Sequence, residues 1–217
     1  MIKSLRSDTT IGIIGAGGLG KEVLCVLGEL IGWENLNKRV GFLVEPAFHN
    51  MENVLGVNVL PLSFTSIPFD FVVIAIGDIK SRMRIRNALP PHTRYATVVH
   101  PSAQLTPFTK IGEGSVVLGQ VFLSCDVEIG SFSIINPGTT ISHDNITGDF
   151  FTTSPGVNIS GNCKIGNRVF MGANSSTRNT ITIGDDVLVG MGSVVVKDLL
   201  VPGTYIGNPA TLIQNKS

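Results

Sequence analysis

The chain has 217 residues, of which 43% are hydrophobic and 15% are charged, so it can bury a sizeable core and intrinsic disorder is not expected. Its 16 basic and 16 acidic residues cancel, and only 6% of its residues are aromatic, which argues against a surface for nucleic acid or acidic membranes. This length allows one or two compact domains.

Cysteine usage and the first residues bear on the compartment. The three cysteines form no CxxC pair, so neither a metal site nor a disulfide framework is expected, and we predict free thiols in a reducing compartment. Residues 1–10 lack the long apolar run of a signal peptide, and no apolar run reaches membrane-spanning length. A cytoplasmic protein is therefore expected.

The first half of the chain, residues 1–97, alternates strand and helix signals. Strands are predicted at Ile11–Ile14, Arg39–Val44, Val54–Val59 and Phe69–Ile76, and helices at Lys21–Ile31 and Lys80–Leu89. Such alternation predicts a small parallel α/β domain of the Rossmann-like kind.

A glycine-rich loop follows the first strand. The segment GAGGLG matches G-x-G-x-x-G through Gly15, Gly17 and Gly20, between a predicted strand and a predicted helix. In that context glycines let the backbone approach a pyrophosphate, and the helix N-terminus supplies N–H donors. Glu45 follows the second strand, where an acidic side chain can bind a ribose hydroxyl. The alternative is a structural glycine turn.

A nicotinamide dinucleotide is not the favoured ligand of this loop. The domain is small and shows no second mononucleotide-binding half, and nothing downstream has the pattern of a hydride-transfer site. Taken alone, the loop predicts NAD, and these two features weigh against that ligand.

From residue 98 a six-residue repeat replaces the helical signal. Of the eighteen residues taken every sixth place from Val99 to Val201, fifteen are apolar and three are Thr. Glycines recur every eighteen residues one place later, at 112, 130, 148, 166 and 184. This double period predicts a solenoid in which each hexad is a short strand and a turn, three hexads form one triangular coil, and coils stack about 4.8 Å apart.

The hexads IGEGSV, IGSFSI, IGNRVF and IGDDVL resemble those of the hexapeptide-repeat acyltransferases. The resemblance implies an all-β left-handed parallel β-helix for residues 98–217, whereas parallel crossovers in general are right-handed. The closing segment Gly207–Ala210 is similar to the end of that family's repeat.

The order of the two domains resembles the group of sialic-acid O-acetyltransferases and bacillosamine N-acetyltransferases. In that group the first domain binds the nucleotide of a nucleotide-linked sugar. The resemblance implies substrate contacts at Gly15, Gly17, Gly18, Glu45, Gly77, Lys80 and Arg82. For Lys80 and Arg82, which would add positive charge, a solvated helix face is an equal alternative.

Acyl transfer needs a base, and the second domain has only two histidines, His100 and His143. His143 holds the third place of its hexad, where the neighbouring coils have Cys125 and Gly161. From the residues alone, a catalytic base and an exposed histidine at a coil edge stay equally open. The resemblance implies that His143 is the base, that Asp144 orients its ring, and that Asn136 lies near the sugar.

The resemblance also implies sites for acetyl-CoA. Thr152 stands where the group has a second histidine that helps to position the donor, and contacts to the pantetheine are implied for Gly161, Gly172 and Gly190. The alternative for these glycines is a plain structural role at coil corners. Because the donor lies between neighbouring solenoids in that family, a homotrimer with active sites between subunits is implied.

We therefore expect an enzyme that moves an acetyl group from acetyl-CoA to the amino group of a nucleotide-linked sugar. A 4-amino-4,6-dideoxy sugar of surface glycan biosynthesis is the expected acceptor. Two alternatives stay open at this point. One is O-acetylation of a sialic-acid-type sugar, and the other is a nucleotide-binding module with a purely structural β-helix.

Overall fold

The computed structural model describes residues 8–213. The prediction about a signal peptide concerned residues 1–10, and the first seven of these lie outside the described range. The chain divides into two compact units, the first ending at residue 101 and including 113–116, the second formed by 102–112 and the chain from 117 onward. Within residues 8–213, no helix is long and apolar enough to cross a membrane.

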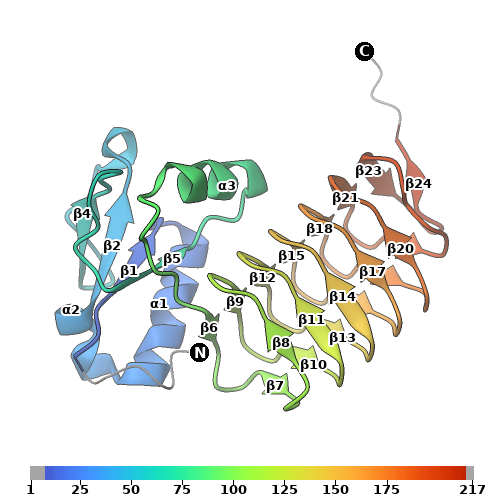
Figure 1. Cartoon of the computed structure of the whole chain (residues 1–217), viewed down its shortest axis with the longest axis horizontal. Coiled ribbons are helices and arrows are strands. Elements are labelled where there is room, and N and C mark those ends of the chain that lie inside the picture. Colours follow the sequence, from blue (N-terminus) through green and yellow to red (C-terminus); the bar gives the residue numbers. More distant parts are fainter. Residues whose placement is uncertain (1–7, 214–217) are drawn as a thin grey trace. The chain divides into compact units, whose positions relative to one another are not determined.

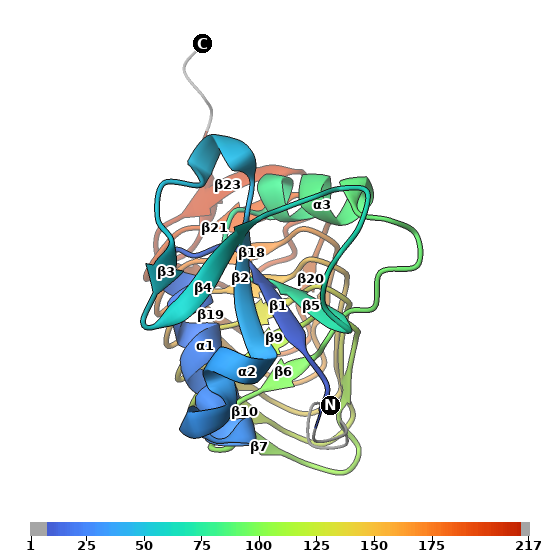
Figure 2. The ribbon, with the colours of Figure 1, turned by 90° about the vertical axis from the view of Figure 1, so that its left-hand side faces the viewer.

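The first unit is built on a five-stranded sheet with the order β3-β4-β2-β1-β5, which Figure 2 shows side by side. Its strands are β1 (Ile11–Ile14), β2 (Val40–Val44), β3 (Asn53–Val54), β4 (Val57–Pro61) and β5 (Phe71–Ile74). Strands β2, β1 and β5 run parallel, as does β4 beside β2. The helices are α1 (Gly18–Ile31), α2 (Leu36–Arg39) and α3 (Ile79–Ala88), with 3₁₀ turns η2 (Trp33–Asn35) and η3 (Pro46–Phe48).

Strand β1, which lies between β2 and β5, is buried along its whole length, which explains why it carries no polar side chain. Helix α1 buries Val23, Leu24 and Leu27 at helical spacing. Each such side chain contributes about 1.5–3 kcal/mol through removal from water. The core of this unit thus fixes the carboxyl ends of the parallel strands.

The predicted single strand at residues 54–59 is wrong, because the structure has a hairpin there. Strands β3 and β4 pair antiparallel, and Leu55 and Gly56 between them have φ angles of 51° and 81°. Two consecutive residues with positive φ are the signature of a tight hairpin turn. The sequence signal was Gly56, which was included in a continuous strand.

The second unit is a parallel β-solenoid of the left-handed β-helix type, and Figure 1 shows its coils stacked in chain order from green to red. The first sheet contains β7 (Gln104–Leu105), β10 (Phe122–Leu123), β13 (Thr140–Ile141), β16 (Asn158–Ile159), β19 (Ser176–Thr177) and β22 (Val194–Val195). The second contains β8 (Lys110–Ile111), β11 (Val127–Ile129), β14 (Asn145–Thr147), β17 (Lys164–Ile165) and β20 (Thr182–Ile183).

The third sheet has eight strands, the last of which, β24, is antiparallel to its neighbour. It contains β6 (Val98–Val99), β9 (Val116–Val117), β12 (Ile134–Ile135), β15 (Thr152–Thr153), β18 (Phe170–Met171), β21 (Val187–Val189), β23 (Gly203–Ile206) and β24 (Thr211–Leu212).

The register confirms the repeat. Leu123 pairs with Ile141, and Ile141 pairs with Ile159, so each coil advances by eighteen residues and the apolar first place stacks on its copies. From residue 114 to residue 192, the fourth place of each hexad turns the corner in the left-handed region, as at Asp126 with φ 53° and Asp144 with φ 58°. The glycine that recurs every eighteen residues lets neighbouring coils approach closely. A Cβ on Gly130, for example, would lie 2.2 Å from the carbonyl oxygen of Gly148.

The repeat does not keep its phase to the end, which corrects the prediction for Val201. That side chain is 56% exposed, whereas Leu199 is 4% exposed and bridges Ile183, so Leu199 holds the inward place. Val189 pairs with Tyr205, sixteen residues on instead of eighteen. The last coil is therefore two residues short, and Leu199 was missed because the six-residue step passes over it.

Candidate functional site

A cavity of about 400 Å³ opens at the carboxyl ends of β1, β2 and β5 in the α/β unit. The parallel pairing of β1 with both neighbours brings the loops after these strands to one edge, where parallel sheets bind ligands. The cavity is lined by Ile14, Gly15, Ala16, Gly17, Leu43, Val44, Glu45, Phe48, Met51, Ile76, Ser81, Arg84 and Ile85. The structure thus brings three of the predicted residues, Gly15, Gly17 and Glu45, to one cavity.

The glycines of the loop after β1 differ in whether the fold itself requires glycine at their place. Gly15 has φ +104°, a conformation that favours glycine, and a Cβ on Gly20 would lie 2.0 Å from the carbonyl oxygen of Gly15. Neither reason applies to Gly17 or Gly18, where a Cβ would meet nothing within 4 Å. The same holds for Gly77 in the loop after β5. The fold itself therefore gives no reason for glycine at these three places.

The N-terminus of α1 is also open to a ligand. Its N-cap is Gly17, which provides no side-chain hydrogen bond, and its first turn carries no acidic residue. The first N–H groups of a helix have no partner within the helix and attract anions. This end of α1 can therefore receive a phosphate group without displacing a side-chain cap.

Glu45 is paired with a residue that the sequence analysis missed. Arg84 on α3 donates from both Nη atoms to the Glu45 carboxylate, over 2.8 Å and 2.6 Å. The hydrogen bond from Arg84 holds the pKa of the Glu45 carboxyl below its usual range. Arg84 follows Ser81 by three residues, so both lie on one face of α3 and both line the cavity. That helical spacing was the available sequence signal.

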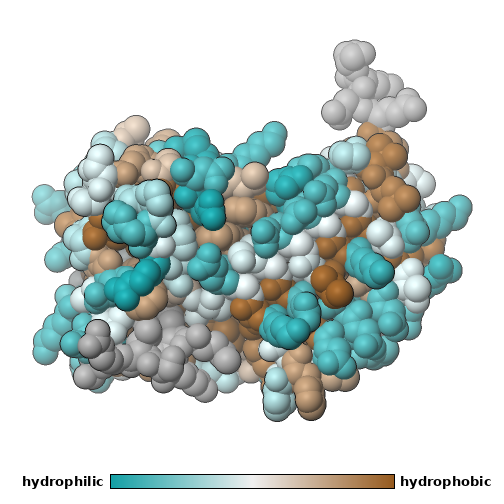
Figure 3. Space-filling view, in the orientation of Figure 1, coloured by the Kyte–Doolittle hydropathy of each residue, from teal (hydrophilic) through white to brown (hydrophobic). Residues whose placement is uncertain are grey.

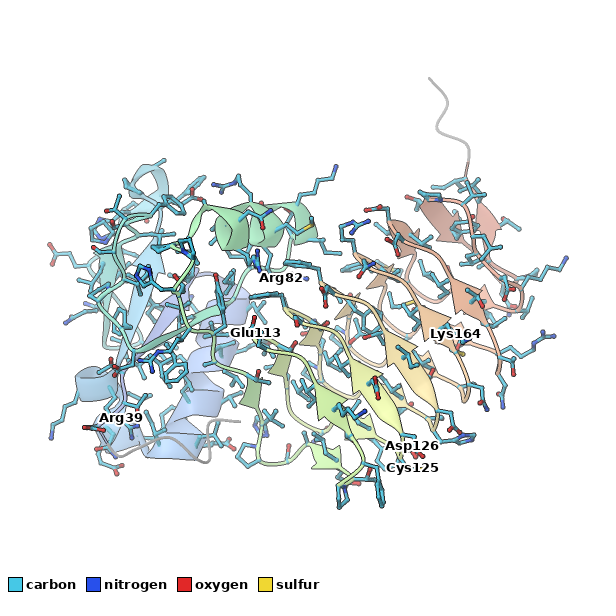
Figure 4. The ribbon with its side chains drawn as sticks, viewed as in Figure 1. Arg39, Arg82, Glu113, Cys125, Asp126 and Lys164 are labelled. Atoms are coloured by element: carbon cyan, nitrogen blue, oxygen red, sulfur yellow. The ribbon has the colours of Figure 1, made fainter. Side chains whose placement is uncertain are left out.

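Arg82 is buried, so the alternative that it lies on a solvated helix face is wrong. Its side chain is 1% exposed and donates to the carbonyl oxygens of Ile76, at 2.7 Å, and Gly77, at 3.0 Å. Burial lowers the pKa of its guanidinium to about 10. Arg82, labelled in Figure 4, thus holds the loop after β5 in shape and does not line the cavity.

The remaining residues of this segment flank the cavity. Asp78 caps α3 by accepting a hydrogen bond from the Ser81 backbone N–H over 2.7 Å, which lowers the pKa of its carboxyl. Lys80 is exposed and is not among the lining residues. Its contact with a substrate stays a prediction.

In the solenoid, His143 and Asp144 form a pair at a coil corner. Nδ1 of His143 lies 2.6 Å from Oδ2 of Asp144, and both side chains are about half exposed, at 50% and 52%. An ionised carboxylate can only accept, so Nδ1 of a neutral imidazole at this place carries the proton and Nε2 is then the ring nitrogen with a lone pair. The arrangement can take a proton from a molecule at the surface of the coil.

The His143 ring lies over Gly161 of the next coil. A Cβ on Gly161 would be 2.7 Å from Cε1 and 2.8 Å from Nε2 of the ring. Glycine at this place therefore makes room for the imidazole, which is a structural reason that the sequence analysis did not foresee. A contact between Gly161 and acetyl-CoA stays a prediction.

The other predicted residues of the solenoid have structural contacts of their own. Nδ2 of Asn136 donates to the carbonyl oxygen of Thr153 over 2.6 Å. Thr152 is 2% exposed, and its hydroxyl lies 3.4 Å from the carbonyl oxygen of Phe150. A place near the sugar for Asn136 and a contact of Thr152 with acetyl-CoA stay predictions.

Gly172 and Gly190 lie one above the other in successive coils. A Cβ on Gly172 would be 2.7 Å from the backbone carbon of Gly190, and a Cβ on Gly190 would be 2.7 Å from Cγ2 of Ile206. Close packing of coils thus explains both glycines, in agreement with the structural alternative. Among residues 8–213, no group of three His, Cys, Asp or Glu side chains is placed to hold a metal ion.

Known proteins are similar to this chain in sequence and in fold. Residues 162–197 match the family model described as a hexapeptide repeat of succinyl-transferase. The chain is 29% identical to PerB from Caulobacter crescentus, solved with CoA and GDP-perosamine, over 94% of this chain and 97% of that one, with a TM-score of 0.79. The resemblance inferred from the sequence is confirmed. The chain is similar over nearly its whole length to the sugar N-acetyltransferase group of hexapeptide-repeat proteins.

Two further relatives agree with this result. The acetyltransferase domain of PglB from Neisseria gonorrhoeae, solved with acetyl coenzyme A, is 28% identical over 95% of this chain and all of that chain, with a TM-score of 0.81. A serine acetyltransferase of Helicobacter pylori is 41% identical over 49 residues, which are 23% of this chain and 29% of that protein. The chain thus matches less than a third of this curated relative, and that match is confined to a short segment.

Proposed function

We propose that the protein transfers the acetyl group of acetyl-CoA to the amino group of a nucleotide-linked sugar. The observation that carries this proposal is the His143–Asp144 pair, with its 2.6 Å hydrogen bond at an exposed coil corner of a β-helix. Support comes from the similarity to PerB and PglB, whose structures hold CoA with GDP-perosamine and acetyl coenzyme A, respectively.

The nucleotide is proposed to bind in the cavity of the α/β unit. At Gly17, Gly18 and Gly77 the chain itself leaves room for a side chain. A ligand that lies close to their backbone would explain why these residues are glycines. The open N-terminus of α1 suits the pyrophosphate, and Glu45 suits a ribose hydroxyl. Arg84, which lies at the same cavity, can turn from Glu45 toward a phosphate oxygen.

In the proposed reaction the acceptor nitrogen attacks the thioester carbonyl carbon. A C–N bond forms, the C–S bond breaks, and CoA leaves as the thiolate. Nε2 of His143 takes the proton lost by the nitrogen, and the Asp144 carboxylate stabilises the resulting imidazolium through Nδ1. The proton then passes to the departing sulfur, so that free CoA and the acetamido sugar are released.

The finer parts of the proposal rest on the resemblance. The acceptor is proposed to be a 4-amino-4,6-dideoxy sugar used in surface glycan biosynthesis, acetylated in the cytoplasm. A homotrimer with active sites between subunits is proposed as the working form. Figure 3 shows brown, apolar areas on the face of the solenoid that it presents. The exposed apolar side chains of the solenoid include Ile146, Leu188 and Met191, and such side chains are consistent with burial between subunits.

The test is release of free thiol from acetyl-CoA in the presence of nucleotide-linked 4-amino sugars, each paired with the otherwise identical 4-hydroxy sugar. We expect release with at least one amino sugar and none with its hydroxyl partner, and mass spectrometry should find one added acetyl group. Release only with a hydroxy sugar would replace N-acetylation by O-acetylation. Nucleotide binding without any release would favour a binding module with a structural β-helix.

A further inference from the structure

We propose that Asn145 is a positioning residue that fixes the turn carrying His143 and Asp144. This inference rests on the proposed function of His143 and adds a residue that has no part in the reaction as written above. Asn145 is fully buried, at 0% exposure, directly after the exposed pair. It would act through the histidine and not through contact with either substrate.

A buried asparagine breaks the pattern of its own column in the solenoid. The fifth place of the hexad points inward at this corner and is held by Val127 one coil before and by Cys163 and Ile181 in the two coils after. All three neighbours are buried at 1% exposure or less. A polar side chain in an apolar column costs stability unless its hydrogen bonds are made. Such a local exception is expected where function requires it.

The side chain of Asn145 satisfies its hydrogen bonds on the turn itself. Nδ2 donates to the carbonyl oxygens of Ser142 at 2.8 Å, His143 at 3.2 Å and Ser160 at 3.0 Å. Oδ1 accepts from the backbone N–H of Cys163 over 3.1 Å. One amide group therefore ties the backbone on both sides of the His143 side chain to the next coil.

These bonds bear on the geometry of the catalytic pair. Asp144 has φ 58°, the left-handed conformation that turns its carboxylate back toward Nδ1 of His143. The backbone carbonyl of His143 is held twice, by Nδ2 of Asn145 and by the N–H of Asn162 at 3.0 Å. The backbone on both sides of His143 is thus fixed, and the hydrogen bond from Nδ1 to Asp144 holds the imidazole where it lies over Gly161. Preorganisation of this kind lowers the barrier of the chemical step.

The experiment compares Asn145→Val with wild type in the thiol-release assay. Valine copies Val127 in the same column, so it fits the corner but provides no hydrogen bonds. We expect kcat to fall about 10- to 100-fold, as a small displacement of a reacting group does, with both KM values within about twofold. Asn145→Cys, which copies Cys163, gives a second variant if valine prevents folding.

The matched control is Asn167→Ala. Asn167 is another asparagine whose Oδ1 accepts a backbone N–H from a neighbouring coil, that of Asp149 at 2.9 Å, but it lies at a different corner. Its loss should lower the melting temperature and leave kcat unchanged. A purely structural role for Asn145 would make both variants behave in this way.

A spectroscopic measurement separates positioning from stability. Long-range ¹H–¹⁵N spectra of the His143 ring should show one tautomer with the proton on Nδ1 in wild type, and a changed or mixed signature in Asn145→Val. Unchanged kcat and an unchanged ring spectrum in a folded Asn145 variant would overturn the inference. If the wild type transfers no acetyl group to any acceptor, the proposed function fails, and the ring spectrum alone decides whether Asn145 positions His143.

Discussion

The two candidate sites of this protein are built in opposite ways. In the solenoid, the proposed base, its proposed carboxylate partner and the proposed positioning residue are three consecutive residues, 143–145, on one turn. In the α/β unit, the cavity draws on residues from 14 to 85, from three loops that only the sheet brings together. A repeat fold can therefore carry chemistry as a short local exception to its pattern, whereas an α/β fold assembles its site from long-range pairing.

The largest effect is expected at the local site. His143→Ala should lower kcat by about 10²- to 10⁴-fold because it removes the proposed general base. The coil should survive, since the side chain is half exposed and Gly161 beneath it needs no support. The measurement is turnover by thiol release, together with circular dichroism and melting temperature.

A matched control exists one coil earlier. Cys125 holds the same place in its hexad, and Cys125 and Asp126 are labelled in Figure 4. Cys125→Ala should leave turnover within about twofold, because this residue is outside the proposed chemistry. Equal losses in the two variants would mean that the corner, and not the imidazole, matters.

The assembled site is tested by two glycines of one loop. Gly17→Ala should weaken nucleotide binding by about 1–3 kcal/mol, the usual effect of an added methyl group in a filled space, with little change in melting temperature. Gly20→Ala should instead lower the melting temperature, because its Cβ would lie 2.0 Å from the Gly15 carbonyl oxygen. Isothermal titration with the free nucleotide and thermal melting separate the two effects. Unchanged binding by Gly17→Ala would remove the ligand from this loop.

A smaller effect is expected at the charged pair of the cavity. Arg84→Gln should raise the KM for the nucleotide-linked sugar by roughly tenfold, as loss of a charged hydrogen bond does, with kcat nearly unchanged. Lys80→Gln is the comparison, since Lys80 is exposed and does not line the cavity. A larger rise in KM for the Lys80 variant would assign the phosphate contact to Lys80, which the resemblance implied as a substrate contact.

The smallest effect concerns stability and pH. The pKa of Glu45 is lowered in the folded protein by its bond to Arg84, so the contribution of this pair is present above the unfolded pKa of glutamate. It is lost as the pH falls through the lower, folded-state value. The difference in urea midpoint between wild type and Glu45→Gln should therefore be small at neutral pH and vanish in acid. A difference that grows in acid would contradict the pairing.

The sequence predicted the solenoid better than the α/β unit for a physical reason. Each coil repeats the same local geometry, so a six-residue step identified the inward positions from Leu105 to Val195. It failed at Val201, where a coil two residues short breaks the period. In the α/β unit the strands were found, but a hairpin turn at Leu55 and Gly56 was included in a strand.

The same contrast holds for the candidate sites. The contact between His143 and Asp144, which the resemblance implied, could be predicted because neighbours in sequence are neighbours in space. The contact between Arg84 and Glu45 could not be predicted, although the helical spacing of Arg84 from Ser81 was visible, because the two residues are 39 positions apart and only the folded sheet and helix bring them together. Asn145 can be recognised in the sequence as a polar residue in an apolar column. This becomes visible only when the fifth places of the hexads are aligned as well as the first places.

We propose that the cavity of the α/β unit binds the nucleotide of the acceptor whose amino group is acetylated by means of His143. The most direct test measures kcat/KM for one amino sugar with and without its nucleotide, in wild type and in Gly17→Ala. We expect wild type to use the nucleotide-linked sugar far better than the free sugar, and Gly17→Ala to lose most of that preference. Equal use of both forms by wild type would contradict the account.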